Sequence, residues 1–298
     1  MKKSILLIAA AAVTMTACQK EIELPQEEKA TVETLTQWTL TVNAEKPGDS
    51  GTKSLELEGN KTLHAYWKAG ETVNVFKGPD YIGSLDITPA GDERPVKATL
   101  SGTLTLTAVS VGDELTLLFP GRNDRLWTYI GQNGLLAGEG SIETDFDYAG
   151  ATITVTGKDE SAGKLTTGTA SFETLQSIYR FGFWHGGSPV PVKTLTLSSA
   201  IGQIAADCDP ATGTAATGEL TIKRPDADTE LVYVAIRNGN KTDDDTFSFT
   251  VFDADGATYK GSKTIPAAAL DKGFVSAKSI AMQRLDLPKS TKGVSNVL

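Results

Sequence analysis

Few residues of this chain have the types and spacing that enzymatic chemistry requires. The 298 residues contain two histidines, His64 and His185, and two cysteines, Cys18 and Cys208, and each pair is far apart in the sequence. These residues do not have the short spacings of a conventional zinc site. Two glycines follow His185, as in an oxyanion loop, but no Gly-x-Ser-x-Gly nucleophile elbow accompanies them. No catalytic or metal site is therefore predicted, although a hydrolase triad assembled only in space stays open.

Two segments are similar to a phosphate-binding loop, which has four residues between its glycines and a Ser or Thr after its lysine. Residues 157–164 have five residues between the glycines, and Leu165 follows the lysine. In residues 256–264, Ser262 separates the glycine from the lysine. Both segments are predicted to be turns, and no cofactor is expected.

Two acidic clusters flank the predicted strand at residues 246–252. They are the three aspartates at 243–245 and the sequence Asp-Ala-Asp-Gly at 253–256. Asp-x-Asp-Gly can direct its carboxylates at Ca²⁺, which takes six to eight oxygen ligands. The later ligands of an EF-hand loop are missing, and Asp-Gly is a common hairpin turn. We predict a solvated turn, while calcium binding by Asp253 and Asp255 stays open.

Cys18 has the clearest chemical role. Two lysines follow Met1, and residues 5–13 form an apolar run of about nine residues, the length of a signal-peptide core and too short to cross a bilayer. The run leads into Met-Thr-Ala-Cys at 15–18, which resembles the lipobox of bacterial lipoproteins. We predict a lipoprotein signal peptide at residues 1–17 and palmitate-type lipidation of Cys18. A buried cysteine behind an ordinary secretory signal is the alternative.

The residues after Cys18 predict a flexible tether at 18–30, because they are polar and include a proline. Gln-Lys-Glu-Ile-Glu at 19–23 resembles a charged signal that directs lipoproteins to the outer leaflet of the outer membrane. If Cys18 carries lipid, Cys208 has no partner for an intrachain disulfide. Cys208 is then expected to be a small structural residue.

The charge of the chain argues against a nucleic-acid partner. The sequence has 28 Lys and Arg against 37 Asp and Glu, a net charge of −9 and a pI near 4.9. Phosphate binding needs a cationic surface.

The 38 threonines, 29 glycines and 12 prolines are typical of strands and turns, and 40% hydrophobic residues suffice to form cores.

From about residue 31, apolar and polar residues alternate at period two, as in half-buried strands. In the first run, Trp38, Leu40 and Val42 share one face. Turn residues separate the runs, which predicts an all-β protein. The one helical candidate is residues 267–270, which follow Pro266. The clear runs are residues 36–42, 72–76, 103–107, 151–156, 194–197, 231–236, 247–252 and 274–282.

The number of expected strands exceeds one ordinary β-sandwich, so two are predicted. We place the N-terminal sandwich at residues 31–160 and the C-terminal sandwich at residues 165–287, with a tail at 288–298. The polar segment 157–168 is the predicted boundary.

Residues 66–76, YWKAGETVNVF, resemble the Trp-x-Ala-Gly-Asp-x-Ile-x-Val-Phe signature of fimbrillins, the type V pilins. Further segments similar to that family follow in order over residues 50–285. Among them are LLFP at 117–120, YIGQNG at 129–134 and VYVAI at 232–236. The resemblance implies two tandem transthyretin-like β-sandwich domains behind the signal peptide. It also implies a non-enzymatic outer-membrane lipoprotein on the cell surface that acts in cell adhesion.

The resemblance further implies other fimbrial subunits as partners, joined by β-strand addition, with a host or bacterial surface ligand as a further candidate. Stalk subunits of that family are cut after an early arginine, whereas here the first arginine is Arg94, followed by proline. We therefore expect a structural, accessory or anchor subunit of type V fimbriae that keeps its first strand. Lys46, Lys53 and Lys61 leave cleavage by a lysine-directed protease open.

A non-polymerising glycan-binding surface lipoprotein is the alternative function. Aromatic residues that alternate along a strand, at Trp127 and Tyr129 and in the segment 181–184, could stack on sugars if they were exposed. Aromatic residues in such strands more often face the core, and this is what we expect here.

Overall fold

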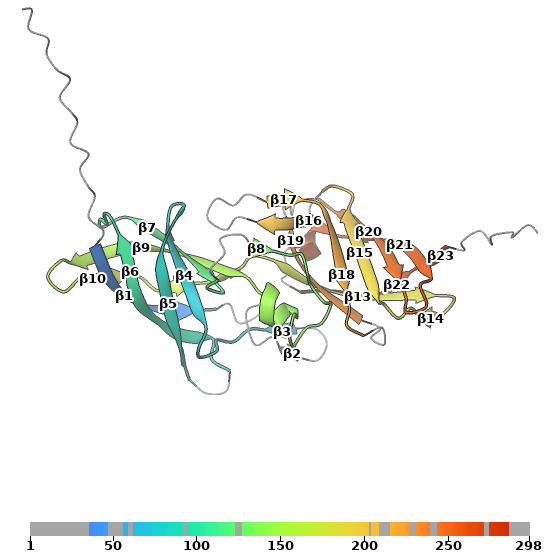
Figure 1. Ribbon diagram of the computed structural model, residues 1–298, viewed down its shortest axis with the longest axis horizontal. Coiled ribbons are helices and arrows are strands. Elements are labelled where there is room, and N and C mark those ends of the chain that lie inside the picture. The colour runs from blue at the N-terminus through green and yellow to red at the C-terminus, as the bar shows by residue number, and fades with distance from the viewer. Residues whose placement is uncertain are drawn as a thin grey trace, which may run out of the picture. The chain divides into compact units, whose positions relative to one another are not determined.

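The structure is a computed structural model (Figure 1). It describes residues 36–46, 56–58, 62–91, 94–122, 127–202, 204–208, 215–226, 231–238, 243–270 and 274–285. Cys18, Lys53, Lys61 and the segments predicted as signal peptide, tether and C-terminal tail lie outside these residues.

A mixed sheet, here called the first sheet, contains the N-terminal strands. In the described part of the chain it has nine strands in the order β10-β1-β6-β5-β4-β7-β9-β12, and β11 pairs with β1. Because β10 also pairs with β9, the sheet closes on itself. A separate hairpin joins β2 (Glu56–Glu58) to β3 (Thr62–His64). The strands of the first sheet are β1 (Thr36–Glu45), β4 (Thr72–Lys77), β5 (Asp80–Ala90), β6 (Lys97–Leu106), β7 (Glu114–Phe119), β9 (Ala149–Asp159), β10 (Lys164–Thr167), β11 (Ala170–Ser171) and β12 (Glu173–Thr174).

Two further sheets contain most of the later strands. Among the described residues, one sheet follows the order β14-β13-β19-β16-β17, with β22 beside β13 and β8 beside β16, and the other follows β18-β15-β20-β21-β23. The first of these has β8 (Trp127–Thr128), β13 (Ser177–His185), β14 (Ser188–Pro189), β16 (Ile204–Cys208), β17 (Ala215–Thr217), β19 (Leu231–Asn238) and β22 (Phe274–Ala281). The second has β15 (Thr194–Ser199), β18 (Glu219–Lys223), β20 (Asp245–Phe252), β21 (Thr258–Ile265) and β23 (Gln283–Leu285).

Buried apolar side chains form two cores. The first core lies inside the first sheet and includes Trp38, Leu40, Val42, Trp67, Val73, Val75, Leu100, Leu117, Phe119, Leu165 and Phe172. The second core joins the two later sheets, where Phe181 of β13 packs edge-on against Phe249 of β20 at a centroid distance of 5.0 Å. Two packed sheets with interdigitating inner faces are a β-sandwich. The predicted all-β sandwich class is confirmed.

The second core also takes in residues that come early in the chain. Tyr129 and Tyr148 belong to it, as do Ile142 and Phe146 of the π-helical turn η1 (Ile142–Phe146). The helical turn predicted after Pro266 is present as α1 (Ala267–Leu270).

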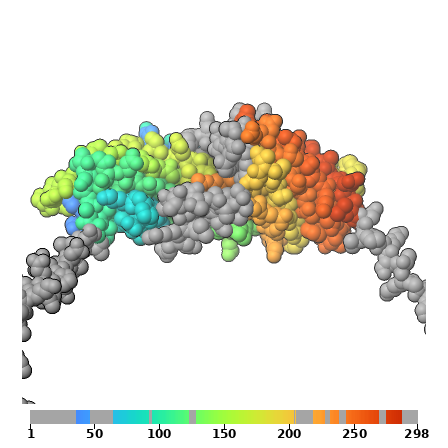
Figure 2. Space-filling model, turned by 90° about the horizontal axis from the view of Figure 1, so that it is seen from above, coloured from blue at the N-terminus to red at the C-terminus, as the bar shows by residue number. Residues whose placement is uncertain are grey.

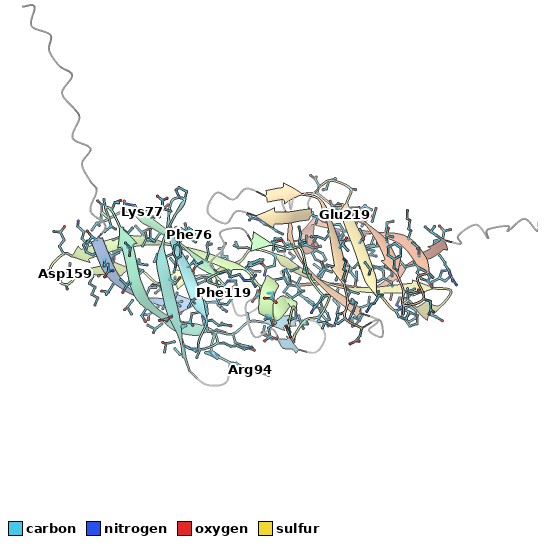
Figure 3. All side chains as sticks on the ribbon, viewed as in Figure 1. Phe76, Lys77, Arg94, Phe119, Asp159 and Glu219 are labelled. Carbon is cyan, nitrogen blue, oxygen red and sulfur yellow. The ribbon has the colours of Figure 1, made fainter. Side chains whose placement is uncertain are left out.

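Residues 157–168 lie at one end of the first sheet. They contain the end of β9, a turn and β10, and Figure 3 marks this place with Asp159. The Asp159 carboxylate accepts hydrogen bonds from the backbone N–H groups of Ser161 and Ala162 at 3.0 and 3.1 Å, which makes the phosphate-loop-like segment a turn, as predicted. The described residues belong to one compact unit, and the division into two domains stays a prediction.

Two local predictions are wrong. Residues 258–265 form strand β21 and not a turn, because they pair along their whole length with β20. Strand β4 is buried on both faces and not on one. Val73 and Val75 face the first core, while Phe76 on the opposite face joins the second. The buried amide of Asn74 is satisfied, because it donates to the carbonyl of Arg122 and accepts from the Ser84 hydroxyl at 2.8 Å.

Candidate subunit-interaction site

Strand β1 is paired on both of its edges. On one side it forms an antiparallel ladder with β6 that runs from Thr36 opposite Leu106 to Glu45 opposite Lys97. On the other side it runs parallel to β10 and then to β11. Removing β1 would expose two strand edges at once, and such edges bind added strands.

The side chains of β1 alternate as the sequence predicts. Trp38, Leu40 and Val42 are buried, with 6%, 1% and 3% of their surface exposed, and Ala44 continues this row. The residues between them are exposed. Each large apolar side chain contributes about 1.5–3 kcal/mol when fully buried, so these residues hold β1 in the sheet.

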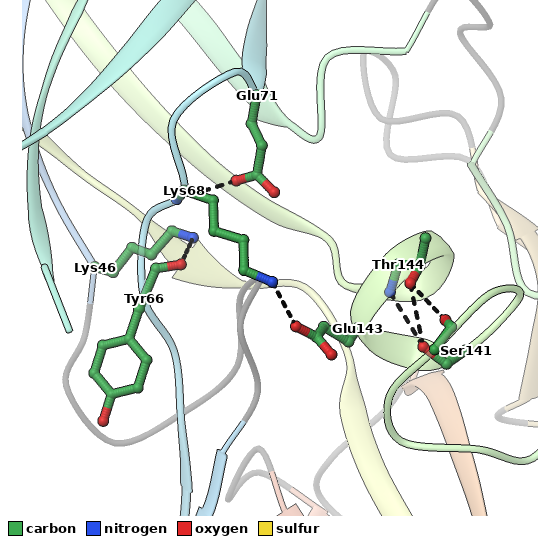
Figure 4. Close-up of polar contacts among 8 residues, drawn as sticks. Lys46, Tyr66, Lys68, Glu71, Ser141, Glu143 and Thr144 are labelled. Atoms are coloured by element: carbon green, nitrogen blue, oxygen red, sulfur yellow. Dashed lines mark hydrogen bonds and ion pairs between the residues drawn. The ribbon is translucent and has the colours of Figure 1, made fainter. Parts of the chain in front are cut away.

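The chain leaves β1 through Lys46, which is buried although it is a lysine. The backbone N–H of Lys46 donates to the Val96 carbonyl at 2.9 Å, and its ammonium group donates to the Tyr66 carbonyl at 3.2 Å (Figure 4). The same ammonium lies 3.8 Å from the ring centre of Trp67 and 4.4 Å from that of Phe119. Cation–π attraction between these groups strengthens when they are shielded from water.

Trp67, the first residue of the fimbrillin-like signature, is a centre of the first core. Its indole N–H donates to the Val96 carbonyl at 3.1 Å. Its ring meets Phe119 and Phe172 edge-on at 5.5 and 5.2 Å. Residues from β7 and from the segment before β12 therefore converge on the signature beside the end of β1, and Figure 3 marks Phe119 within this region.

The signature also contacts η1. The Lys68 ammonium forms an ion pair with Glu143 at 2.7 Å, and the Glu71 carboxylate accepts from the Lys68 backbone N–H at 3.4 Å (Figure 4). The hydroxyl of Ser141 caps the first turn of η1 by accepting from the backbone N–H of Thr144. Since η1 places Ile142 and Phe146 in the second core, the signature links β1 to that core.

Gln132, which lies in the segment YIGQNG, joins that segment to Ala235 of β19. Its amide accepts from the Ala235 N–H at 2.7 Å and donates to the Ala235 carbonyl at 2.9 Å. Next to it, the Tyr233 N–H donates to the Gly134 carbonyl at 2.9 Å. The segment thus covers part of β19 as a short strand would.

The two histidines have different partners. His64 stacks on Tyr66 with ring centres 6.4 Å apart, whereas Nδ1 of His185 lies 3.0 Å from the Met282 carbonyl oxygen. The backbone of Cys208 belongs to β16, and its side chain, like Cys18, is outside the described atoms. Within the described ranges, no group of three or more His, Cys, Asp and Glu residues is placed to hold a metal ion.

The segment 253–256 forms the predicted turn. The Asp253 carboxylate accepts from the backbone N–H groups of Asp255 and Ala257 at 3.0 and 2.8 Å and from the Tyr259 hydroxyl at 3.1 Å. Burial first, and then this hydrogen bond, raise the pKa of Tyr259. Asp245 corrects the prediction of a solvated cluster, because it is fully buried and accepts from the Ser199 hydroxyl.

Of the aromatic residues predicted to alternate, those whose side chains the structure describes mostly face the interior, as predicted, while the side chain of Trp127 lies outside the described atoms. Tyr129, Phe181 and Phe183 are fully buried. Trp184 is 38% exposed, and its indole N–H donates to the Lys278 carbonyl at 3.0 Å. In the part of the chain that the structure covers, no helix is both long and apolar enough to cross a membrane.

No family model matches the chain, and no curated protein does. Solved structures with similar architecture include a candidate cell adhesion protein of Bacteroides uniformis, with 15% identity over 86% of this chain and 98% of that one and a TM-score of 0.40. A candidate cell adhesion protein of Bacteroides ovatus has 11% identity, coverages of 83% and 95%, and a TM-score of 0.42. A fimbrial assembly protein of Parabacteroides distasonis has 10% identity over 82% of this chain and 90% of that one, with a TM-score of 0.35.

Proposed function

We propose that the protein is a fimbrillin-like surface lipoprotein, held in the outer membrane by lipid on Cys18, and that it serves in cell adhesion without enzymatic activity. It acts as a structural, accessory or anchor subunit of type V fimbriae. The observation that carries the proposal is the integration of β1, which is paired on both edges and ends in the buried Lys46. The lipobox-like sequence at 15–18 and the ordered segments over residues 50–285 support it.

The burial of Lys46 supports an uncleaved first strand. A lysine-directed protease must take the lysine side chain into its own pocket, and the Lys46 side chain is 4% exposed between two aromatic rings. The early chain offers no arginine before Arg94, which lies in the connection between β5 and β6 (Figure 3). An uncleaved β1 keeps the first core closed.

Other subunits would be joined by strand addition. If β1 were displaced, a partner strand of the same alternation would find the β6 edge on one side and the β10 and β11 edges on the other. An intact β1 limits this protein to starting or ending a fibre, which is why an anchor or accessory role is proposed in place of a stalk.

Replacing the lipidated cysteine tests the proposal. Cys18→Ala should give an unprocessed or misplaced precursor that takes up no palmitate label, while Cys208→Ala should be processed and labelled as the parent is. A Cys18→Ala protein that still fractionates with membranes and accepts palmitate would contradict the lipid anchor.

Glycan binding is a second candidate, favoured by the partly exposed ring of Trp184. An aromatic ring with one face exposed to solvent can stack on a sugar. A glycan array probed with the parent and with Trp184→Ala would decide it. Binding that disappears with Trp184 supports this candidate, and no binding to any glycan contradicts it.

A further inference from the structure

A pocket, here called the slot, opens between β5 and β6 at one end of the first sheet. Among the described residues, the ladder between these strands ends where Gly83 lies opposite Leu104. The slot has a volume of about 370 Å³, which is within the usual range of small-molecule sites. It is lined by Lys77, by residues 80–82 of β5 and by residues 105–108 at the end of β6. In Figure 2 these strands, cyan to green, lie at the surface.

A β-bulge in β5 lies at the closed end of the slot. Val75 of β4 pairs with Gly83 and Phe76 pairs with Tyr81, so Ile82 is an extra residue in β5. A bulge bends its strand and re-aims the side chains beside it. The two strands are in close contact at Gly83, where a Cβ atom would lie 2.6 Å from a carbonyl oxygen of β6. The bulge therefore marks the point at which β5 leaves β6.

Both walls of the slot are held in place by other contacts. Strand β6 stays paired on its other edge with the first residues of β1. The Lys77 ammonium donates to the Ala108 carbonyl at 2.8 Å and forms an ion pair with Asp113 at 2.7 Å. Figure 3 labels Lys77 beside Phe76 at this end of the sheet. The slot is therefore preformed, as most small-molecule sites are.

Tyr81 presents a fixed aromatic ring at the slot. The residue is 47% exposed, although its ring meets Phe76 edge-on at a centroid distance of 5.8 Å. The hydroxyl oxygens of Tyr81 and Ser84 lie 2.8 Å apart, and Ser84 already donates to the Asn74 amide oxygen at 2.8 Å. Tyr81 is therefore the donor, and its ring is oriented before any ligand arrives. An exposed aromatic ring of this kind can stack on the C–H face of a sugar.

The rest of the lining has an apolar floor and exposed polar groups. Ile82 and Leu106 are 7% and 3% exposed and form the floor. Thr105 and Thr107 alternate with Leu106, so their hydroxyls lie on the exposed face of the chain. Asp80 is also exposed. Threonine hydroxyls donate and accept hydrogen bonds, and a carboxylate accepts them, so these groups suit the hydroxyls of a sugar.

The charges of the lining favour a neutral ligand over an acidic one. The ammonium of Lys77 is balanced by its ion pair with Asp113. In the described part of the chain, the Asp80 carboxylate has no hydrogen-bond or ion-pair partner. Asp80 would repel a carboxylate in the slot but can accept hydrogen bonds from neutral hydroxyl groups.

We propose that the slot between β5 and β6 binds a neutral pyranose residue of a glycan. The C–H face of the sugar would rest on Tyr81, and its hydroxyl groups would bond to Asp80, Thr105 and Thr107. The slot belongs to a different sheet from Trp184 of β13. It requires neither the lipid anchor nor fimbrial assembly, so the inference goes beyond the proposed function.

The ligand class can be tested with methyl β-glucopyranoside, methyl β-galactopyranoside and the uronate of each, in which the hydroxymethyl group is oxidised to a carboxylate. In isothermal titration of the purified chain, at least one neutral glycoside should bind, and its uronate should bind at least about fivefold more weakly. Asp80→Asn should reduce this preference to within about twofold, because it removes the repelling charge. Asp86→Asn should keep the preference and is the matched control, because Asp86 is exposed on β5 but outside the lining.

The stacking role of Tyr81 can be tested with the same neutral glycoside. Tyr81→Ala should weaken its binding at least about tenfold, whereas Tyr81→Phe keeps the ring and should stay within about threefold. Phe252→Ala is the matched control, because Phe252 is an aromatic residue 39% exposed outside the lining, and it should change binding less than about twofold. Circular dichroism of each variant would confirm that it is folded. Asp80→Asn, a nearly isosteric change at an exposed position, keeps the test decisive if Tyr81→Ala does not fold.

Four results would overturn the proposal. They are binding of neither neutral glycoside, equal binding of a neutral glycoside and its uronate, a preference that persists in Asp80→Asn, and binding that survives Tyr81→Ala. Binding that survives Tyr81→Ala but disappears with Trp184→Ala would assign the sugar to the Trp184 candidate instead.

Discussion

The ammonium group of Lys46 lies 3.8 Å from the ring centre of Trp67. Lys46 follows the first strand, and Trp67 is the tryptophan of the segment similar to the fimbrillin signature. Their contact ties the end of β1 to the centre of the first core, where Trp67 also meets Phe119 and Phe172. Whether β1 stays in place therefore depends on a buried cation as well as on apolar packing.

Lys46→Ala should lower the free energy of unfolding by about 2 kcal/mol, because it removes a buried aliphatic stem together with the cation over the ring. Urea unfolding followed by tryptophan fluorescence measures this. Lys97→Ala is the control, because Lys97 pairs with Glu45 at the same end of β1 but is exposed, and it should leave the midpoint unchanged. A Lys46 variant as stable as the parent would contradict the assigned role.

Trp67→Ala should destabilise the protein by about 3–5 kcal/mol, the usual loss for a large buried aromatic residue. Trp67→Phe should destabilise the protein less, because it keeps an aromatic ring in the core. It still loses the hydrogen bond to the Val96 carbonyl. Equilibrium unfolding in urea gives both values. A loss below about 1 kcal/mol for Trp67→Ala would mean that the residue is not a core residue in solution.

Gln132→Met should destabilise the protein by about 1–3 kcal/mol, since it leaves the buried N–H and C=O groups of Ala235 without their partner. Hydrogen exchange should show faster exchange of the Ala235 amide, with little change in β1. Gln37→Met, at an exposed position of β1, is the control. Unchanged protection of Ala235 would contradict the strand-like role of Gln132.

The position of the domain boundary can be tested with separate fragments. Residues 31–175 should be more stable than residues 31–160, because the shorter fragment lacks β10, β11 and β12, which pair with β1 and β9. Residues 165–287 should also show a strand-dominated circular dichroism spectrum, although this fragment lacks the core residues Tyr129 and Tyr148. Strong helical minima from either half, or equal stability of the two N-terminal fragments, would contradict this prediction.

Local patterns in the sequence were sufficient to predict the class of fold. Alternation at Trp38, Leu40 and Val42 indicates a half-buried strand wherever that strand lies, and Pro266 marks the start of α1. Pairing between distant segments was not predictable in this way. The alternation of β22 does not reveal that it lies parallel to β13, nor does β4 reveal that both of its faces are covered.

The candidate site was predictable only in part. The sequence predicts the signature at 66–76 and the first strand, but it indicates Lys46 only as a cleavage position. A lysine at the end of a strand is ordinarily solvated, and its burial follows from the distant rings of Trp67 and Phe119. The burial of Asp245 was not predictable for the same reason. Its carboxylate accepts a hydrogen bond from the hydroxyl of Ser199, which lies on another strand.

The N-terminal mass of protein extracted from the cell surface tests the central claim most directly. The proposed role predicts a mature chain that begins at acylated Cys18 and retains Trp38, Leu40 and Val42. A dominant form that begins beyond Val42, found in fibres that resist detergent, would contradict it and identify a polymerising stalk subunit.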